Sequence, residues 1–275
     1  MPLTSFQSRV LRLLARHRNP ESYVAGSTPL NRERPRISED VDIFHDREEQ
    51  VARAAEEDTA TLRAEGFDIV WIRREPAIQM AEIRSGNEST HLEWVADSDY
   101  RFFPTVKDEL FGYILHPIDL ATNKALAAAG RQKPGDAVDL LTIHSHILPL
   151  GAVIWAAVEK APGYTPEGLI AEIRRIAVRY REEDLRAVPS NEVIDPKLFH
   201  NRLRAILDEA EAFVMRMPTE KAGLLFLKDG KVVQPDPDRL EEYATHAGRR
   251  QGHWPTSMEI TAAMFEHYRK NPPIF

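Results

Sequence analysis

A glycine-serine pair at the end of a short apolar run is the feature that most constrains this chain. In the segment YVAGSTPL, residues 23–30, the apolar run stops at Gly26 and favours a strand. Residues 30–34 indicate one or two helical turns. Gly26 and Ser27 are therefore expected where a strand passes into the start of a helix. Because unpaired backbone N–H groups and the helix dipole favour negative charge there, this junction can hold a phosphate.

A second strand, DVDIF, follows at residues 40–44. Side chains alternate between the faces of a strand, so Asp40 and Asp42 should share one face, and Val41, Ile43 and Phe44 are assigned to the buried side. Mg²⁺ takes carboxylate oxygens together with substrate phosphates, and such ions can stabilise an in-line phosphoryl displacement. Surface strands often carry an isolated aspartate pair. Its combination with the upstream glycine and serine is what predicts a phosphoryl-transfer site.

The same residues resemble a known superfamily. A Gly-Ser pair at a strand end followed by an Asp-x-Asp strand is similar to the nucleotidyltransferases that include DNA polymerase β. Arg36 and Ser38 before the aspartates resemble the AbiEii/AbiGii branch of toxin-like nucleotidyltransferases, which also contains the MenT toxins. A second block, HPIDLATNKAL from residue 116, then Arg131 and GDAVDL from Gly135, resembles that family's D-L-x-x-x-K-x-x-A and R-D-x-x-D-L motifs, with glycine in place of the second motif's arginine. The resemblance covers about residues 20–145.

This resemblance implies transfer of NMP from an NTP, with Mg²⁺ or Mn²⁺, to a macromolecular acceptor. The acceptor would be the 3′ end of a tRNA or a protein hydroxyl, and a cognate antitoxin is a candidate partner. The implied catalytic residues are Asp40, Asp42, Glu93, Lys124 and Asp136, of which the first three would hold metal. The implied nucleotide contacts are Gly26, Ser27, Thr28, Arg36, Ser38 and Lys124, with Lys124 as a fixed positive charge on the triphosphate.

Glu93 is the candidate for a third carboxylate, with Asp97 in reserve, because it lies near the centre of the predicted strand at residues 91–96. The alternative is an exposed glutamate that alternates with buried Leu92 and Trp94. His91 is assigned to the surface or the core, since no second histidine lies nearby at metal-ligand spacing.

The predicted fold class is α+β: a polymerase β-like mixed sheet with helices on one face, followed by a mostly helical C-terminal region. Residues 1–115 would form the catalytic core and residues 116–275 a helical domain that completes the cleft. Further strands are expected at 68–73 and 78–84, an irregular loop at 98–115, a helix at 117–130, and a hairpin at 223–233.

Several side chains receive local assignments. Asp46 and Glu49 suggest a capping box for a helix that ends near residue 65, and Asp139 suggests a helix cap without further role. Arg101 and Lys107 could reach phosphates from the irregular loop. Long helices are expected at 165–180 and 196–216, and shorter ones at 240–247 and 257–270.

Charge and composition narrow the function classes. A net charge of −7 argues against a generally basic nucleic-acid binder, and the absence of cysteine excludes disulfides and thiolate metal sites. No apolar stretch predicts a membrane helix or a signal peptide, so a cytoplasmic protein is expected. An amphipathic helix at residues 5–18 carries Arg9, Arg12, Arg16 and Arg18, either as a solvated face or as a grip on RNA or an acidic partner. Two rivals to nucleotidyl transfer stay open: a kinase-like phosphotransferase and a non-catalytic nucleotide- or partner-binding module.

Overall fold

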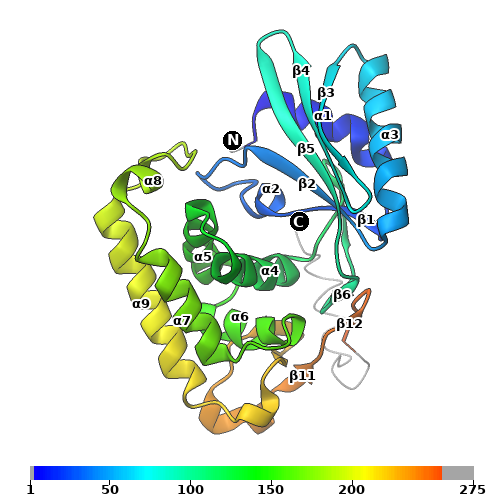
Figure 1. The fold of residues 1–275 in the computed structure, drawn as a ribbon. Helices are drawn as coiled ribbons and strands as arrows, with labels where there is room; N and C mark the ends of the chain where they lie inside the picture. Colours follow the sequence, from blue (N-terminus) through cyan, green and yellow to red (C-terminus); the bar gives the residue numbers. More distant parts are fainter. Residues whose placement is uncertain (1–2, 256–275) are drawn as a thin grey trace. The chain divides into compact units, whose positions relative to one another are not determined.

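The computed structural model describes residues 3–255 of the chain. The chain divides into two compact units, shown in Figure 1. The first comprises Met1–Leu120 with Val188–Val193, and the second comprises Ala121–Ala187 with Ile194–Phe275. The predicted α+β class, a mixed sheet with helices followed by a mostly helical region, is confirmed.

The first unit is built around a sheet. Its helices are α1 (Ser5–Leu14), η1 (Ala15–His17), α2 (Ser27–Leu30) and α3 (Glu48–Ala64). Its strands are β1 (Ser22–Ala25), β2 (Asp40–His45), β3 (Asp68–Glu75), β4 (Ile78–Ser85), β5 (Glu88–Ala96), β6 (Tyr100–Arg101), β7 (Val106–Asp108) and β8 (Gly112–Ile114). Seven of these strands pair in the order β3-β4-β5-β2-β1-β8-β7, with β2 parallel to β5, β1 parallel to β8 and the other neighbours antiparallel.

One face of this sheet is covered by α1 and α3 (Figure 1). Residues of α1 spaced three or four apart, such as Phe6, Val10 and Leu14, meet the alternating apolar residues of the strands, such as Val41 and Leu92. Burial of this face leaves the opposite face of β2 and β5 for polar side chains. Phe44 lies on that opposite face, where it packs in the apolar cluster of Tyr23 and Leu115, so its assignment to the same side as Val41 was wrong.

Two local expectations for the first unit were also wrong. Asp46 does not cap α3, because the N-cap is Arg47 without a side-chain hydrogen bond, and the Asp46 carboxylate pairs with Arg101 instead. Residues 98–115 are not wholly irregular: β7 and β8 extend the sheet at one edge. Their brevity explains why the sequence pattern gave no strand signal.

The second unit is mainly helical. Its helices are α4 (Pro117–Gly130, which begins in the first unit), α5 (Pro134–His146), α6 (Leu150–Ala157), η2 (Val158–Lys160), α7 (Pro166–Ala177), α8 (Glu182–Arg186), α9 (Pro196–Val214), η3 (Thr219–Lys221) and η4 (Pro237–Glu242). Its strands are β9 (Leu225–Lys228), β10 (Lys231–Val233), β11 (Ala244–His246) and β12 (Arg249–Arg250).

The predicted hairpin of the second unit is confirmed as β9 and β10, which β11 joins on the other side of β9. Residues 240–247 were predicted as a helix, and this was wrong: the 3₁₀ helix η4 ends there and β11 follows. The helix predicted at 257–270 lies outside the described residues.

Among residues 3–255, no single helix is both long and apolar enough to cross a membrane. The bent pair Pro134–His146 with Leu150–Lys160 meets those criteria together, by length and composition only.

Candidate functional site

The predicted glycine-serine junction lies where β1 ends and α2 begins. Gly26 has a φ of 69° and a ψ of −147°, a backbone conformation that is strongly unfavourable for residues with a Cβ. A Cβ added at Gly26 would overlap Oδ2 of Asp42 and stand 2.9 Å from its Cγ. The side-chain amide of Asn31 donates to the Ser27 carbonyl oxygen over 3.1 Å and so steadies the turn. Glycine at position 26 therefore lets the Asp42 carboxylate lie directly against the turn.

Sheet register brings the predicted carboxylates to one face. Asp42 on β2 lies opposite Glu93 on the parallel neighbour β5. Asp40, Asp42 and Glu93 are partly exposed, whereas Val41 and Leu92, which alternate with them, are 0% exposed. Since successive side chains point to opposite faces, the three carboxylates project together, away from the helix-covered side.

Two hydroxyl groups fix the start of β2. The Thr28 hydroxyl donates to the Asp40 main-chain carbonyl oxygen over 2.8 Å, and the Ser38 hydroxyl donates to the same atom over 2.9 Å. From α1, the buried Gln7 side chain donates to the Ser38 carbonyl oxygen over 2.8 Å. Thr28 and Ser38 thus hold the strand that carries the aspartates, and their contact with a nucleotide stays a prediction.

The imidazole of His91 was missed as part of this face. Its Nδ1 lies 3.2 Å from Oδ1 of Asp40, and the two residues are register partners on parallel strands. His91 precedes Glu93 by two positions and therefore shares its face. That alternation was the available signal, but the pairing of β5 with β2 could not be read from the sequence.

The donor set fits a magnesium ion that completes its shell with substrate. Among residues 3–255, no group of three or more His, Asp and Glu side chains is arranged to hold a metal by itself. Magnesium in phosphoryl-transfer sites needs only one or two protein carboxylates, and substrate phosphates and water supply the remaining ligands. Asp40 and Asp42 satisfy that requirement, and the Asp42 carboxylate occupies the space that a side chain at position 26 would fill.

Arg36 lies in the segment between α2 and β2 and is only 6% exposed. This segment pairs with a distant stretch of the chain: the Ile37 N–H donates to the Pro189 carbonyl oxygen over 2.9 Å, and Arg36 forms a β-bridge with Ser190. The segment is thereby anchored to residues 188–193, which belong to the first unit. A role for Arg36 in nucleotide binding stays a prediction.

The predicted lysine and aspartate meet in the second unit. Nζ of Lys124 lies 2.8 Å from Oδ1 of Asp136 and 3.0 Å from Oδ2 of Asp139, and the Lys124 side chain is 5% exposed. Arg131 donates to the other Asp136 oxygen over 2.7 Å. Burial alone would raise the pKa of Asp136, but the hydrogen bonds and charges of Arg131 and Lys124 outweigh it and lower the pKa.

Asp139 is not the helix cap that its position suggested. The helix α5 begins at Pro134, and its N-cap is Lys133, without a side-chain hydrogen bond. Asp139 is 0% exposed and shares Lys124 with Asp136. A buried carboxylate requires a partner, and the i, i+3 spacing of the two aspartates was the signal that they face one lysine.

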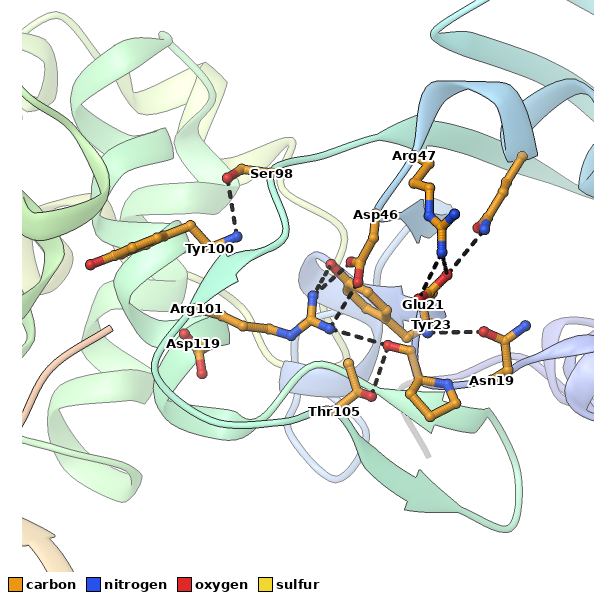
Figure 2. A network of polar contacts seen from close by, with 12 residues as sticks. Asn19, Glu21, Tyr23, Asp46, Arg47, Ser98, Tyr100, Arg101, Thr105 and Asp119 are labelled. Carbon is orange, nitrogen blue, oxygen red and sulfur yellow. Dashed lines mark hydrogen bonds and ion pairs between the residues drawn. The ribbon is translucent and has the colours of Figure 1, made fainter. Parts of the chain in front are cut away.

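Arg101, a weak candidate for phosphate contact, is a structural residue. Its guanidinium points at Asp46 in Figure 2, with ion-pair distances of 2.7 and 3.0 Å, and donates to the Pro20 carbonyl oxygen over 3.2 Å. The Arg101 side chain is 3% exposed. Asp119 is structural as well, because its carboxylate accepts the N–H groups of Phe102 and Phe103 over 2.8 and 3.0 Å.

Comparisons with known proteins give resemblances at the level of the fold. No family model matches the chain, and no curated protein sequence matches it. A solved structure from H. pylori, described as a candidate nucleotidyltransferase, is similar over 77% of this chain and 93% of its own, with 15% identity and a TM-score of 0.46.

Two structures of Cid1 are also similar. One, described by its RNA terminal uridylyl transferase activity, has 11% identity and a TM-score of 0.29 over 98% of this chain and 86% of its own. The other, described as poly(U) polymerase with Mg and 3′-dATP bound, has 12% identity and a TM-score of 0.29 over 98% of this chain and 87% of its own. Values this low do not assign the chain to a family.

Proposed function

We propose that this protein is a magnesium-dependent nucleotidyltransferase that moves NMP from an NTP to a hydroxyl of a macromolecule. The observation that carries the proposal is the close approach of Asp42 to Gly26, which joins a carboxylate to a backbone turn suited to phosphate. Asp40 and Glu93 on the same face add the further oxygen donors that a metal and a reacting hydroxyl require.

In this proposal the chain's own residues bind and orient. Asp40 and Asp42 would hold the metal, which would supply charge neutralisation at the phosphate oxygens. Ser27 and the backbone N–H groups at the start of α2 donate to the triphosphate. The acceptor oxygen attacks the α-phosphorus, the bond from that phosphorus to the bridging oxygen breaks, and pyrophosphate leaves. Glu93 accepts the proton that the attacking hydroxyl loses.

Lys124 would supply a fixed positive charge for a phosphate group. Asp136 and Asp139 already hold its ammonium group, so a phosphate group would have to compete with these two carboxylates for it. Asp136 is in this respect a positioning residue. Its own ion pair with Arg131 keeps the carboxylate charged and in place.

The resemblance to toxin-like nucleotidyltransferases suggests two acceptors, the 3′ end of a tRNA or a protein hydroxyl. A toxin of this kind would call for a cognate antitoxin. RNA is the favoured acceptor because arginines are gathered on an exposed helix face of this otherwise acidic chain.

The test incubates the full chain with Mg²⁺ and either α- or γ-labelled NTPs in a mixture of total RNA and protein extract. We expect transfer of the α label to RNA. Asp42→Asn should reduce transfer by about 10²-fold or more, because an amide cannot replace the charge of the metal-binding carboxylate. Asp68→Asn, the same change at an exposed carboxylate on the edge strand β3, should leave transfer unchanged.

Two results would contradict the proposed nucleotidyl transfer. Transfer of the γ label alone would identify a kinase-like enzyme and overturn nucleotidyl transfer. Absence of any transfer, together with unchanged Mg·NTP binding by Asp42→Asn in calorimetry, would overturn the assignment of Asp42 and leave a binding module.

A further inference from the structure

The exposed side of α1 carries a stripe of arginines that the proposed active site does not use. Arg9, Arg12 and Arg16 follow one another at spacings of three and four residues through α1 and into η1, and all three are exposed. At 3.6 residues per turn they fall within about 60° of one another, on the side opposite the buried Val10 and Leu14. We call Arg9, Arg12 and Arg16 the arginine stripe.

The stripe is not neutralised by its surroundings. Within residues 3–255, no carboxylate lies within 4.0 Å of the guanidinium groups of the arginine stripe. By contrast, the exposed Arg84 of the same unit pairs with Glu82 over 2.5 Å. On a chain with a net charge of −7, a row of three arginines without a carboxylate within 4.0 Å is a local concentration of positive charge.

Two contacts orient the ends of the stripe. The Arg9 guanidinium lies over the rings of Phe6 and Phe67, 5.4 and 5.0 Å from their centroids. Nε of Arg16 donates to Nε2 of His17 over 3.3 Å, and Nδ1 of His17 lies 2.7 Å from the buried carboxylate of Asp58. Side chains held in this way lose less conformational freedom on binding than unrestrained arginines would.

We propose that the arginine stripe of α1 is a docking surface for the phosphate backbone of an RNA acceptor. The stripe extends about 10 Å along the helix, and phosphates recur every few ångströms along a nucleic-acid strand. Guanidinium groups bind phosphate oxygens in a two-pronged geometry. The choice of RNA rests on the proposed function, whereas the binding of a polyanion rests on the stripe itself.

A lipid surface fits this helix poorly. The apolar side chains of α1, such as Phe6, Val10, Leu11 and Leu14, are at most 2% exposed because they form the core. An interfacial helix needs that apolar side to enter the lipid. A stable protein partner would likewise require apolar or aromatic anchors, whereas the largest apolar side chains of α1 are buried in the core.

The helix that carries the stripe is tied to the strand that carries Asp40. Gln7, on the buried side of α1, donates to the Ser38 carbonyl oxygen over 2.8 Å and to the Thr90 hydroxyl over 3.2 Å. The Ser38 hydroxyl in turn donates to the Asp40 carbonyl oxygen over 2.9 Å. RNA docked on α1 would therefore be held on the same packed unit as the proposed metal-binding strand.

The test measures binding of fluorescent deacylated tRNA to the full chain by anisotropy, without nucleotide, over a series of salt concentrations. The variant is Arg12→Glu with Arg16→Glu, and Arg9 is kept because it packs on two rings. Loss of two phosphate contacts should weaken binding about 10- to 100-fold at 0.1 M salt and reduce the salt slope by about two. Arg12→Lys with Arg16→Lys keeps the charge and should bind within about threefold of the unmodified chain.

The matched control is Arg202→Glu with Arg204→Glu, which makes the same charge change at two exposed arginines of α9. It should bind tRNA within about threefold of the unmodified chain. Equal losses in the control and the stripe variant would overturn the proposal, as would absence of tRNA binding by the unmodified chain. Preferential binding to anionic vesicles or to polyglutamate, lost in the stripe variant, would overturn the choice of RNA.

The binding assay and the transfer assay fail independently. Asp42→Asn should abolish transfer and leave tRNA binding intact, because Asp42 lies on the opposite face of the sheet from α1. The unmodified chain and all variants could fail to transfer NTP label while the stripe variant still loses tRNA binding. In that case the docking surface stands and the proposed chemistry falls. If transfer to RNA proceeds equally in the stripe variant and its binding is unchanged, the docking surface falls and the chemistry stands.

Discussion

Substitution of Gly26 by alanine tests the arrangement on which the proposed site depends. The residue has a φ of 69°, and the added Cβ would overlap Oδ2 of Asp42 and lie 2.9 Å from Cγ. Either the turn changes its backbone conformation or the Asp42 carboxylate moves. Both responses separate the aspartate from the backbone N–H groups at the start of α2.

Two terms give the magnitude. A residue with a Cβ in this backbone region costs about 1–3 kcal/mol, and overpacking against Asp42 adds about 1–3 kcal/mol. We therefore expect the free energy of unfolding to fall by about 2–6 kcal/mol. Gly66→Ala is the matched control, because Gly66 has a φ of 82° but no atom within 4 Å of an added Cβ. It should lose only the backbone term, about 1 kcal/mol.

The assays are urea unfolding for stability and calorimetry for Mg·NTP binding. Gly26→Ala should bind Mg·NTP at least about tenfold more weakly, while Gly66→Ala should bind like the unmodified chain. Equal destabilisation of the two variants, with normal Mg·NTP binding by Gly26→Ala, would refute the close packing of Gly26 and Asp42 as the basis of the site.

Three further variants test buried charge. Burial, reinforced by the charge of Arg18, lowers the pKa of His45 to about 4. The unfolded chain therefore takes up a proton at His45 before the folded chain does, and the free energy of unfolding should fall by about 3 kcal/mol as the pH drops from 6.5 towards 4. His45→Leu should remove this pH dependence from urea unfolding measured across that range. Lys124→Met leaves two buried carboxylates without their shared lysine and should cost about 3–5 kcal/mol in urea unfolding. Arg101→Met should lower the unfolding free energy by a similar ~3 kcal/mol, because the carboxylate of Asp46 that it pairs with is 2% exposed.

Local pattern predicted the parts of the fold that depend on neighbouring residues. Alternation placed the strands at 68–73 and 78–84, observed as β3 and β4, and proline and glycine marked the ends of α4 at Pro117 and Gly130. The alternation in β2 also placed Asp40 and Asp42 on one face. These features could be predicted because each is decided by spacing within a few residues.

Two of the misassigned side chains, Asp46 and Asp139, depend on distant partners, whereas the error at Phe44 broke the alternation of β2 itself. Asp46 reads locally as a helix cap, yet its carboxylate pairs with Arg101, 55 positions further along the chain. Asp139 resembles a helix cap in the local sequence, yet its carboxylate pairs with Lys124 of the preceding helix. A buried ion pair overrides a cap because an unpaired buried charge costs several kcal/mol, against about 1 kcal/mol for a lost cap.

The proposed site differs from both cases. Its two aspartates lie on one strand, whereas the side chains that position that strand come from other segments. Asp40 is oriented by hydrogen bonds to its own carbonyl oxygen from Thr28 and Ser38, and Ser38 is held in turn by Gln7 of α1. None of these supporting side chains carries a net charge, so none adds a charge beside the carboxylates that face the proposed metal ion. The sequence motif therefore identifies the groups that are proposed to react, and only the packed sheet identifies the neutral groups that set their positions.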